Sequence, residues 1–307
     1  MRDTFAAALG AWAEQDERIM FLTADLGFGV FEGFKARFPK QYMNVGVAEQ
    51  NMIAVATGLA LEDYIVFVYS IANFPVLRCL EQIRNDAAYH SANVKVVSIG
   101  GGFSYGPLGM SHHATEDIAI MRAIPEVACF TPGTLRDVES SVEALITTDG
   151  TGYLRLDKSS GAETPDATPF IPGSWRTMSP GDDVALVACG GVLAEAQAAA
   201  ELLRNEGAEA RVVNATQMSP VDNDRVRHDL SGISLAVTIE EHVSAGGLGG
   251  LVAEALSEEG LGTKLLRCGT GSHFVSTVGT QDFLRREVGL DAQSIVDAVC
   301  ASLRSRP

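Results

Sequence analysis

Glu49 is the first residue that suggests chemistry, because this carboxylate lies in the apolar and small-residue run NVGVAEQNMIAVATGLAL at residues 44–61. Acidic side chains are rarely buried unless they are paired or hydrogen-bonded. Two roles are open at this point. Glu49 lies where a polar loop becomes a stretch of helical periodicity, so its charge could stabilise the first turn of a helix. Alternatively, a carboxylate kept away from water could share or receive a proton.

A second candidate is the glycine-rich stretch GGGFSYGPLGMSHHATED at residues 100–117, which contains His112 and His113. Such a loop after a strand can approach a ligand closely, although it can also be only a loop. Adjacent histidines project differently and no third ligand lies at a recognised spacing, so a metal site is disfavoured even with Glu116 and Asp117 nearby. Proton transfer or substrate hydrogen bonding suits the two histidines better.

The run EEHVSAGGLGGLVAEAL at residues 240–256 superficially resembles a dinucleotide-binding loop. The unit lies late in the chain and lacks a convincing acid about 20 residues further on. We therefore attribute its glycines to close packing of a helix on a sheet. His242 and His273 are assigned to strand-end loops, where open α/β sheets place functional groups. Capping or interface roles suit these two histidines equally.

The composition is that of a protein with a substantial core, since 46% of the 307 residues are hydrophobic and 20% are charged. No apolar run reaches the roughly 18–20 residues of a membrane span, and MRDTFAAALGAWAEQDERIMF lacks the basic head of a signal peptide. Five cysteines without CxxC spacing predict free thiols in a reducing cytoplasm. A formal charge of −16 disfavours nucleic-acid and anionic-membrane partners, but allows a small anion in a locally basic pocket.

Apolar, β-rich runs alternate with segments of helical period, which predicts α/β architecture with two parallel-sheet-rich, three-layer domains. In the first half we predict strands at residues 19–26, 64–70, 94–101, 128–132 and 153–157. Helices are predicted there at residues 31–38, 49–61, 77–90, 116–124 and 135–148.

The alternation is interrupted by a stretch rich in Ser, Thr, Pro and Gly and then restarts. In the second half we predict strands at residues 184–191, 209–215, 235–241 and 264–269, and helices at residues 193–206, 249–258 and 292–303. The predicted domains are therefore residues 1–160 and 181–307, with a linker at residues 161–180.

The chain resembles the C-terminal half of transketolases, because six segments occur in the order and spacing of that family: MRDTFAAALG, FLTADLG, NVGVAEQNMIAVATGLAL, LEQIRNDAAYHSANVKV, GMSHHATEDIAIMRAIPE and YLRLDK. It is most like the separate small subunit of split, two-gene bacterial transketolases. It is also similar to deoxyxylulose-phosphate synthase and, more distantly, to the β subunit of 2-oxo-acid dehydrogenases. The resemblance implies a pyrimidine-binding domain for thiamine diphosphate, followed by the transketolase C-terminal domain.

This resemblance implies a role for Glu49. In the family, the matching glutamate hydrogen-bonds a ring nitrogen of the aminopyrimidine of thiamine diphosphate and stabilises its imino form, which allows the thiazolium carbon to lose a proton. The same likeness places Phe74 against the pyrimidine ring. Ile71 aligns with a second family aromatic, Asp25 falls in the cofactor-binding set, and His112 matches the catalytic-loop histidine.

Half of the family's cofactor site is missing from the sequence, which contains no GDG motif followed by paired asparagines. We therefore expect no metal site in this chain. The resemblance implies a large partner subunit that binds the diphosphate with Mg²⁺ or Ca²⁺, in an α2β2 heterotetramer. The chain alone is expected to be inactive.

Several positions that hold a sugar phosphate in the family differ here. Arg2 keeps the expected arginine, but Gly29 and Gly100 stand in place of a serine and a histidine. Lys158 replaces an arginine, which keeps the charge and loses the bidentate fork. Each lost charge-assisted hydrogen bond is worth roughly 1.5–3 kcal/mol. We therefore expect a substrate other than an ordinary pentose phosphate, unless the partner supplies compensating donors.

Two further differences lie in the loop near His112. Leu108 replaces an aspartate that contacts an acceptor hydroxyl in the family, and His113 replaces a glutamine. An apolar side chain at position 108 suits an acceptor with fewer hydroxyl groups.

Three functions remain compatible with the sequence. The first is the small subunit of an enzyme that transfers a two-carbon ketol unit, the second is the β subunit of a 2-oxo-acid dehydrogenase, and the third is a scaffold without catalysis. The segments SHHATED and RNDAAY favour the first function. The presence of Glu49, Phe74 and His112 together opposes the third.

Overall fold

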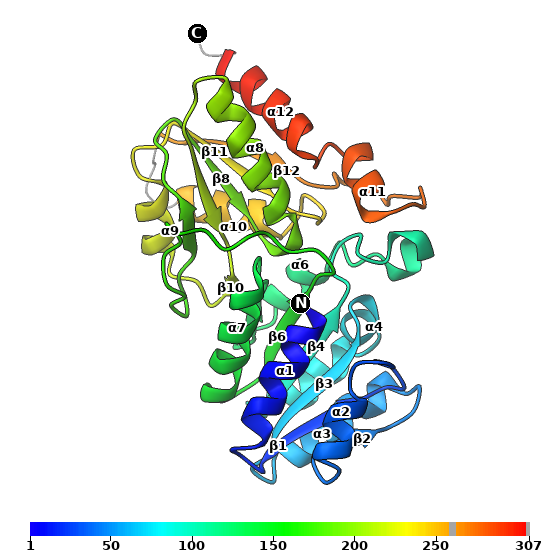
Figure 1. Cartoon of the computed structure of the whole chain (residues 1–307). Helices are drawn as coiled ribbons and strands as arrows, with labels where there is room; N and C mark the ends of the chain where they lie inside the picture. Colours follow the sequence, from blue (N-terminus) through cyan, green and yellow to red (C-terminus); the bar gives the residue numbers. More distant parts are fainter. Residues whose placement is uncertain (258–261, 305–307) are drawn as a thin grey trace.

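The computed structural model describes residues 1–257 and 262–304, which form two α/β lobes arranged end to end (Figure 1). The N-terminal lobe contains a seven-stranded sheet and the C-terminal lobe a five-stranded sheet. Helices cover both faces of each sheet, because the strands are apolar on both sides. The predicted fold class, two mainly parallel α/β domains, is therefore confirmed.

The N-terminal sheet has the strand order β10-β5-β6-β4-β3-β1-β2, and only β10 is antiparallel to its neighbour. Its strands are β1 (Ile19–Thr23), β2 (Tyr42–Asn44), β3 (Ile65–Ile71), β4 (Val94–Ile99), β5 (Ala128–Phe130), β6 (Gly152–Leu156) and β10 (Gln217–Ser219). The parallel strands end at one edge of the sheet, where the loops that follow them come together.

Successive residues of the long strands face two different helix layers. Ile19 and Phe21 of β1 pack in one core with α1 (Arg2–Ala13), α2 (Glu32–Arg37) and α7 (Leu135–Thr147). Met20 and Leu22 face the opposite core, which includes α3 (Glu49–Ala60), α4 (Asn73–Arg78) and α6 (Asp117–Arg122). The second core continues into the C-terminal lobe, so the two lobes share buried apolar surface.

The C-terminal sheet has the order β12-β11-β8-β9-β7, with only β7 antiparallel. Its strands are β7 (Arg176–Ser179), β8 (Val184–Ala188), β9 (Ala210–Asn214), β11 (Leu235–Ile239) and β12 (Lys264–Cys268). The helices of this lobe are α8 (Leu193–Asn205), α9 (Asn223–Leu230), α10 (Leu248–Ser257), α11 (Gln281–Glu287) and α12 (Ala292–Arg304). In Figure 1, α8 and α12 lie side by side on one face.

The structure differs from the predicted elements in three respects. The helices α1, α9 and α11 were not predicted. The single helix predicted at residues 77–90 is wrong: α4 ends at Arg78, Cys79 leaves the helical region (φ −112°, ψ 13°), and a short α5 (Leu80–Gln82) and a π-helical turn η1 (Ile83–Ala88) follow. The short strands β2, β7 and β10 were not predicted, and β7 lies within the predicted linker. They have three or four residues at sheet edges and no sustained apolar run.

A buried carboxylate, Asp137, joins the lobes. It completes a capping box with Thr134 at the start of α7 and accepts a hydrogen bond from Asn214, at the end of β9, at 2.7 Å. It also pairs with Arg176 of β7, whose side chain is 1% exposed. Because each donor comes from a different element, this carboxylate fixes α7 against the C-terminal sheet.

A second buried carboxylate at the junction, Asp157, follows β6. It accepts hydrogen bonds from Gly191 N and, at 3.3 Å, from Ser104 Oγ. Burial raises the pKa of Asp157 to about 6; Arg155 opposes this shift and Glu241 adds to it. The folded protein therefore holds a proton on Asp157 more firmly than the unfolded chain does.

Asp137→Asn should lower the free energy of unfolding by roughly 3 kcal/mol, because it removes the anion that faces the buried Arg176. Arg176 keeps its second partner, Glu163. Urea denaturation would measure the change. Glu209→Gln, which removes an exposed pair with Arg204, should change the same quantity by less than about 0.5 kcal/mol. Equal losses in the two variants would contradict the role given to Asp137.

The raised pKa of Asp157 predicts a pH-dependent stability. An acid whose pKa is higher in the folded state contributes stability that falls as the pH rises through that pKa. The free energy of unfolding of the wild type, measured relative to Asp157→Asn, should therefore fall by about 1 kcal/mol between pH 5.5 and 7 and then level off. Denaturation of both proteins across this range tests the prediction. Parallel pH curves would exclude it.

Candidate functional site

The candidate residues of the N-terminal lobe gather where the parallel strands end. The turn after β1 carries Asp25 and Gly29, and the loop after β2 leads to Glu49 at the first residue of α3. Ile71 ends β3, and Phe74 lies in α4, which follows directly. The topology therefore brings together groups that are distant in sequence.

Glu49 is 7% exposed and forms an ion pair at 2.9 Å with Nη1 of Arg78, the last residue of α4. The guanidinium of Arg78 lies 4.0 Å from the centre of the Phe74 ring. Phe74 in turn meets the imidazole of His112 edge-on, with ring centres 5.2 Å apart. These four side chains form a continuous row, which we call the Glu49 row. In residues 1–257 and 262–304, the one hydrogen bond to the Glu49 carboxylate comes from Arg78.

The turn before the Glu49 row is held by Asn44. Its side chain exchanges two hydrogen bonds with Asp25, each at 3.0 Å, and also accepts one from Gly46 N at 3.0 Å. Asp25 has a positive φ of 56°, which a short acidic side chain tolerates. The Asp25 carboxylate is exposed. Through its hydrogen bonds with Asn44, Asp25 joins the turn after β1 to the loop that leads to Glu49.

The loop between β4 and α6 carries His112 at its tip. An antiparallel bridge between Gly102 and Ala114 closes the base of the loop, and two 3-10 turns, η2 (Gly106–Leu108) and η3 (Met110–His112), form its outer part. Ser111 Oγ lies 3.0 Å from Nδ1 of His112. A hydroxyl at Nδ1 leaves Nε2 available to another group.

His113 points elsewhere. Its ring is 4% exposed and meets the Phe103 ring edge-on at 5.2 Å, and burial lowers its pKa. The structure therefore places His112, but not His113, in the Glu49 row.

A cavity of about 250 Å³ adjoins the row. It is lined by Met1, Arg2, Asp3, Ile99, Tyr105, Asp157 and Lys158. The Lys158 ammonium lies 3.8 Å from the centre of the Tyr105 ring, and that ring is 6.5 Å from the His112 ring. Burial lowers the pKa of Lys158, helped by Arg2, and raises the pKa of Tyr105. We call this space the Lys158 cavity.

Tyr105 was not predicted from the sequence, and Gly100 explains its position. Gly100 has a φ of +99°, and a Cβ atom there would lie 2.2 Å from the Tyr105 ring. The aromatic ring therefore fills the space that a side chain at position 100 would need. The signal was a glycine where a side chain was expected, with a tyrosine five residues later.

Two other candidates lie at the rim of the site. Gly29 is exposed with a φ of +78°, and its N–H donates to Glu32 at 2.8 Å. Leu108 is 55% exposed at the tip of the loop. Neither position presents a hydrogen-bonding side chain to the Lys158 cavity.

In the glycine-rich run at residues 240–256, Gly249 packs closely on the sheet, since a Cβ atom there would lie 3.0 Å from Thr238 Oγ1 of β11. Both oxygens of Glu240 accept hydrogen bonds from the first amides of α10, Leu248 N at 2.7 Å and Gly249 N at 2.8 Å. A carboxylate thus already occupies the place where a dinucleotide phosphate would bind. His242 is buried and accepts from Ala119 N at 3.2 Å, which makes it an inter-lobe contact, whereas His273 is exposed.

Other kinds of site are not supported by the part of the chain that the structure describes. In residues 1–257 and 262–304 there is no group of three or more His, Cys, Asp or Glu side chains that could hold a metal ion. None of the helices within these ranges is both long and apolar enough to cross a membrane. The five cysteines are free thiols.

Comparison with known proteins gives concordant matches along the chain. The family described as "Transketolase, pyrimidine binding domain" matches residues 1–163, and "Transketolase, C-terminal domain" matches residues 173–295. An apulose-4-phosphate transketolase subunit of Actinobacillus succinogenes is 34% identical, over 86% of this chain and 85% of that protein. A 6-deoxy-6-sulfo-D-fructose transketolase subunit of Clostridium sp. is also 34% identical, over 97% of this chain and 92% of its own.

A solved structure agrees with these relatives. It is described as "Split gene transketolase, inactive beta4 tetramer" and shares 33% sequence identity, with a TM-score of 0.86 over 100% of this chain and 98% of its own. The resemblance inferred from the sequence motifs is therefore confirmed, and both matched domains are those of the C-terminal part of the enzyme. This chain belongs to the transketolase family, as a subunit of the split type.

Proposed function

We propose that this chain is the small subunit of a thiamine-diphosphate-dependent transketolase. The enzyme would be a transferase that moves a two-carbon ketol unit from a ketose donor to an aldose or aldehyde acceptor. The observation that carries the proposal is the geometry of Glu49, Arg78 and Phe74. The matched transketolase domains also favour this function over a 2-oxo-acid dehydrogenase subunit.

The residues of the Glu49 row fit the aminopyrimidine of thiamine diphosphate. Arg78 presents a planar group that donates an N–H to Glu49 and stacks on Phe74. An aminopyrimidine is also planar, and it can form the same hydrogen bond and the same stacking contact. The Arg78 side chain is 50% exposed, so it can move into solvent and give up this place.

Each residue then has a separate task. Glu49, nearly withdrawn from water, holds a proton at a pyrimidine ring nitrogen. Phe74 fixes the plane of the ring, and His112 donates or accepts a hydrogen bond at a substrate hydroxyl through Nε2. When bound, thiamine diphosphate would supply the acidic thiazolium carbon needed for ketol transfer.

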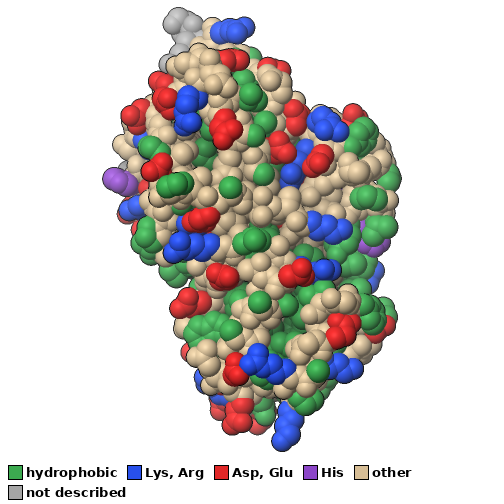
Figure 2. Space-filling model, viewed as in Figure 1, with side chains coloured by type: hydrophobic (Ala, Val, Ile, Leu, Met, Phe, Trp, Pro, Cys, Tyr) green, Lys and Arg blue, Asp and Glu red, His purple; other side chains and the backbone are tan. Residues whose placement is uncertain are grey.

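The surface around the row supports a partner subunit. Large apolar side chains that are at least half exposed lie on the loops and helices beside it: Phe28, Val47, Leu77, Leu108, Met110, Phe274 and Val278. Leu77, Met110 and Phe274 line one cavity together, so part of this surface is continuous. Figure 2 shows hydrophobic side chains at the junction of the lobes, on the side of the His112 loop. Exposed apolar patches of this kind mark protein interfaces.

We infer that a large subunit covers this surface and brings the diphosphate site with Mg²⁺ or Ca²⁺, in an α2β2 assembly. The solved relative is described as an inactive tetramer of β subunits, which agrees with a need for a second type of subunit. The free thiols favour a reducing, cytoplasmic location.

The Lys158 cavity suggests the substrate class. The names of two relatives specify a sugar phosphate and a sulfonated sugar, both of which carry a strong anion. Arg2 and Lys158 could pair with such a group. Tyr105 fills the space beside Gly100, and Leu108 offers no polar atom. We therefore propose that the substrate carries an anionic group but is not an ordinary pentose phosphate.

Glu49→Gln should reduce turnover by the reconstituted enzyme roughly 100-fold or more, because a neutral amide cannot control the proton on the pyrimidine. Ketol transfer and thiamine-diphosphate binding would be measured with the co-purified subunit pair. Glu62→Gln alters an exposed acid just beyond α3 and should leave both values unchanged. A wild-type pair that binds no thiamine diphosphate would instead support a scaffold.

Lys158→Ala should raise the KM for an anionic sugar roughly tenfold, because one charge-assisted contact is lost. The affinity for thiamine diphosphate should stay the same, since Lys158 lies outside the Glu49 row. Lys40→Ala, at an exposed lysine away from the cavity, is the matched control. The proposed substrate class would be refuted by efficient turnover of xylulose 5-phosphate and ribose 5-phosphate at micromolar concentrations.

A further inference from the structure

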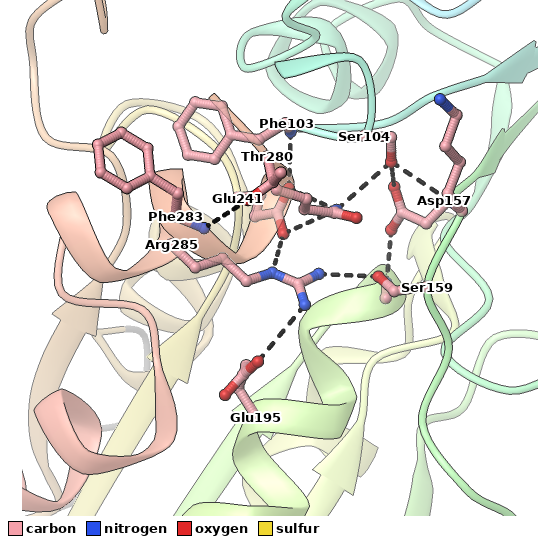
Figure 3. A network of polar contacts seen from close by, with 12 residues as sticks. Phe103, Ser104, Asp157, Ser159, Glu195, Glu241, Thr280, Phe283 and Arg285 are labelled. Atoms are coloured by element: carbon pink, nitrogen blue, oxygen red, sulfur yellow. Dashed lines mark hydrogen bonds and ion pairs between the residues drawn. The ribbon is translucent and has the colours of Figure 1, made fainter. Parts of the chain in front are cut away.

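We propose that Glu241, in the C-terminal lobe, is a positioning residue for the loop that carries His112. Its carboxylate lies at the centre of a buried polar network between the lobes (Figure 3). The inference rests on the proposed function, because that function gives His112 its role. It gives the C-terminal lobe a part in catalysis, whereas all four residues of the Glu49 row belong to the N-terminal lobe.

Glu241 is connected to both sides of the loop's base. Its Oε2 accepts a hydrogen bond from Phe103 N at 2.6 Å, beside the Gly102–Ala114 bridge. On the other side, Nη2 of the buried Arg155 donates both to Ala114 O and to the main-chain oxygen of Glu241, each at 3.1 Å. The carboxylate of Glu241 thus holds one end of the loop directly, and its main chain is linked to the other end through Arg155.

The carboxylate is itself held firmly from the C-terminal side. Arg285 of α11 donates to Oε1 through Nε, and Gln281 Nε2 lies 3.1 Å from each oxygen. Arg285 is fixed further by Ser159 Oγ at 2.9 Å and by Glu195 at 3.5 Å. Glu241 and Arg285 are each 2% exposed, so their interaction is little screened by water.

The loop also rests directly on the C-terminal lobe. Gly102 has a φ of +58°, and a Cβ there would lie 2.2 Å from Glu241 Oε2. At Gly106, in the first 3-10 turn, a Cβ would lie 2.5 Å from Gly279 O. Figure 1 shows this loop reaching toward α11. Fixing the base and the first turn restricts where the second turn, with His112, can lie.

One feature of the network separates positioning from simple support of the fold. Glu241 could satisfy its charge inside the C-terminal lobe, through Arg285 and Gln281 alone. Instead, Oε2 also accepts from the main chain of the loop. A main-chain donor holds the loop whatever its side chains are, and a charged acceptor makes that bond strong.

Glu241→Gln in the full chain tests the proposal. The amide has one oxygen, which should turn toward the Arg285 cation. Its NH₂ group then faces Phe103 N–H, and because both groups are donors, the hydrogen bond to the loop is lost. Hydrogen exchange of the loop amides, residues 102–116, should become roughly tenfold faster. In the reconstituted enzyme kcat should fall in parallel, while the thiamine-diphosphate affinity stays within about twofold because the loop contacts only one end of the Glu49 row.

Asp137→Asn is the matched control. Asp137 is also a buried carboxylate that faces an arginine across the lobe junction, but it has no hydrogen bond to the loop within the described residues. This variant should lose stability without faster exchange at residues 102–116. Unchanged exchange in Glu241→Gln, or an equal increase in both variants, would overturn the proposal.

If Glu241→Gln does not fold, Gln281→Ala replaces it, because this change leaves the Glu241–Arg285 pair intact. It removes the donor to both oxygens of Glu241 and a 3.4 Å contact with Ser104 Oγ of the loop. It should speed exchange of the same amides by roughly threefold, in line with the loss of a neutral donor. No change would overturn the proposal. The exchange measurement needs neither cofactor nor substrate, so it can fail while thiamine-diphosphate binding succeeds, and the reverse.

Discussion

A carboxylate withdrawn from water must be met by a donor, and the candidate site is built around this requirement at Glu49. In the chain by itself the donor is Arg78, which approaches from the last residue of α4. The same guanidinium covers Phe74, so one half-exposed side chain occupies both surfaces that a flat heterocycle would use. The backbone around the site can therefore be formed in advance, and only a half-exposed arginine has to leave.

Buried carboxylates also hold the two lobes together. Asp137, Asp157 and Glu241 each lie at the junction and take donors from both sides of it. Breaking such a contact leaves a charge or a polar group without a partner in a dry place, which costs more than the contact gains. Separation of the lobes is therefore strongly opposed. The loop that carries His112 is held at its base by contacts with both lobes.

The sequence predicted what depends on local pattern and missed what depends on distance in space. Long apolar runs such as β1 and β3 are recognisable because both faces of a parallel sheet are covered. Glu49 was conspicuous as an acid in an apolar run, but its partner is 29 residues away. Glu241 acts on Phe103 from a distance of 138 residues. No periodicity reports such pairs, so Arg78 and Glu241 could be found only once the loops were placed.

The proposed division of the active site between two chains agrees with the different environments that its two halves require. A carboxylate such as Glu49 controls a proton best in a water-poor pocket, whereas a diphosphate and its metal ion need oxygen ligands and water. A chain that builds only the first half must expose apolar residues until its partner arrives. Such exposed apolar residues include Phe28, Val47 and Phe274, each of which is about three-quarters exposed. The exposed apolar surface is therefore a consequence of the proposed chemistry, and assembly would bury the cofactor and these side chains in the same step.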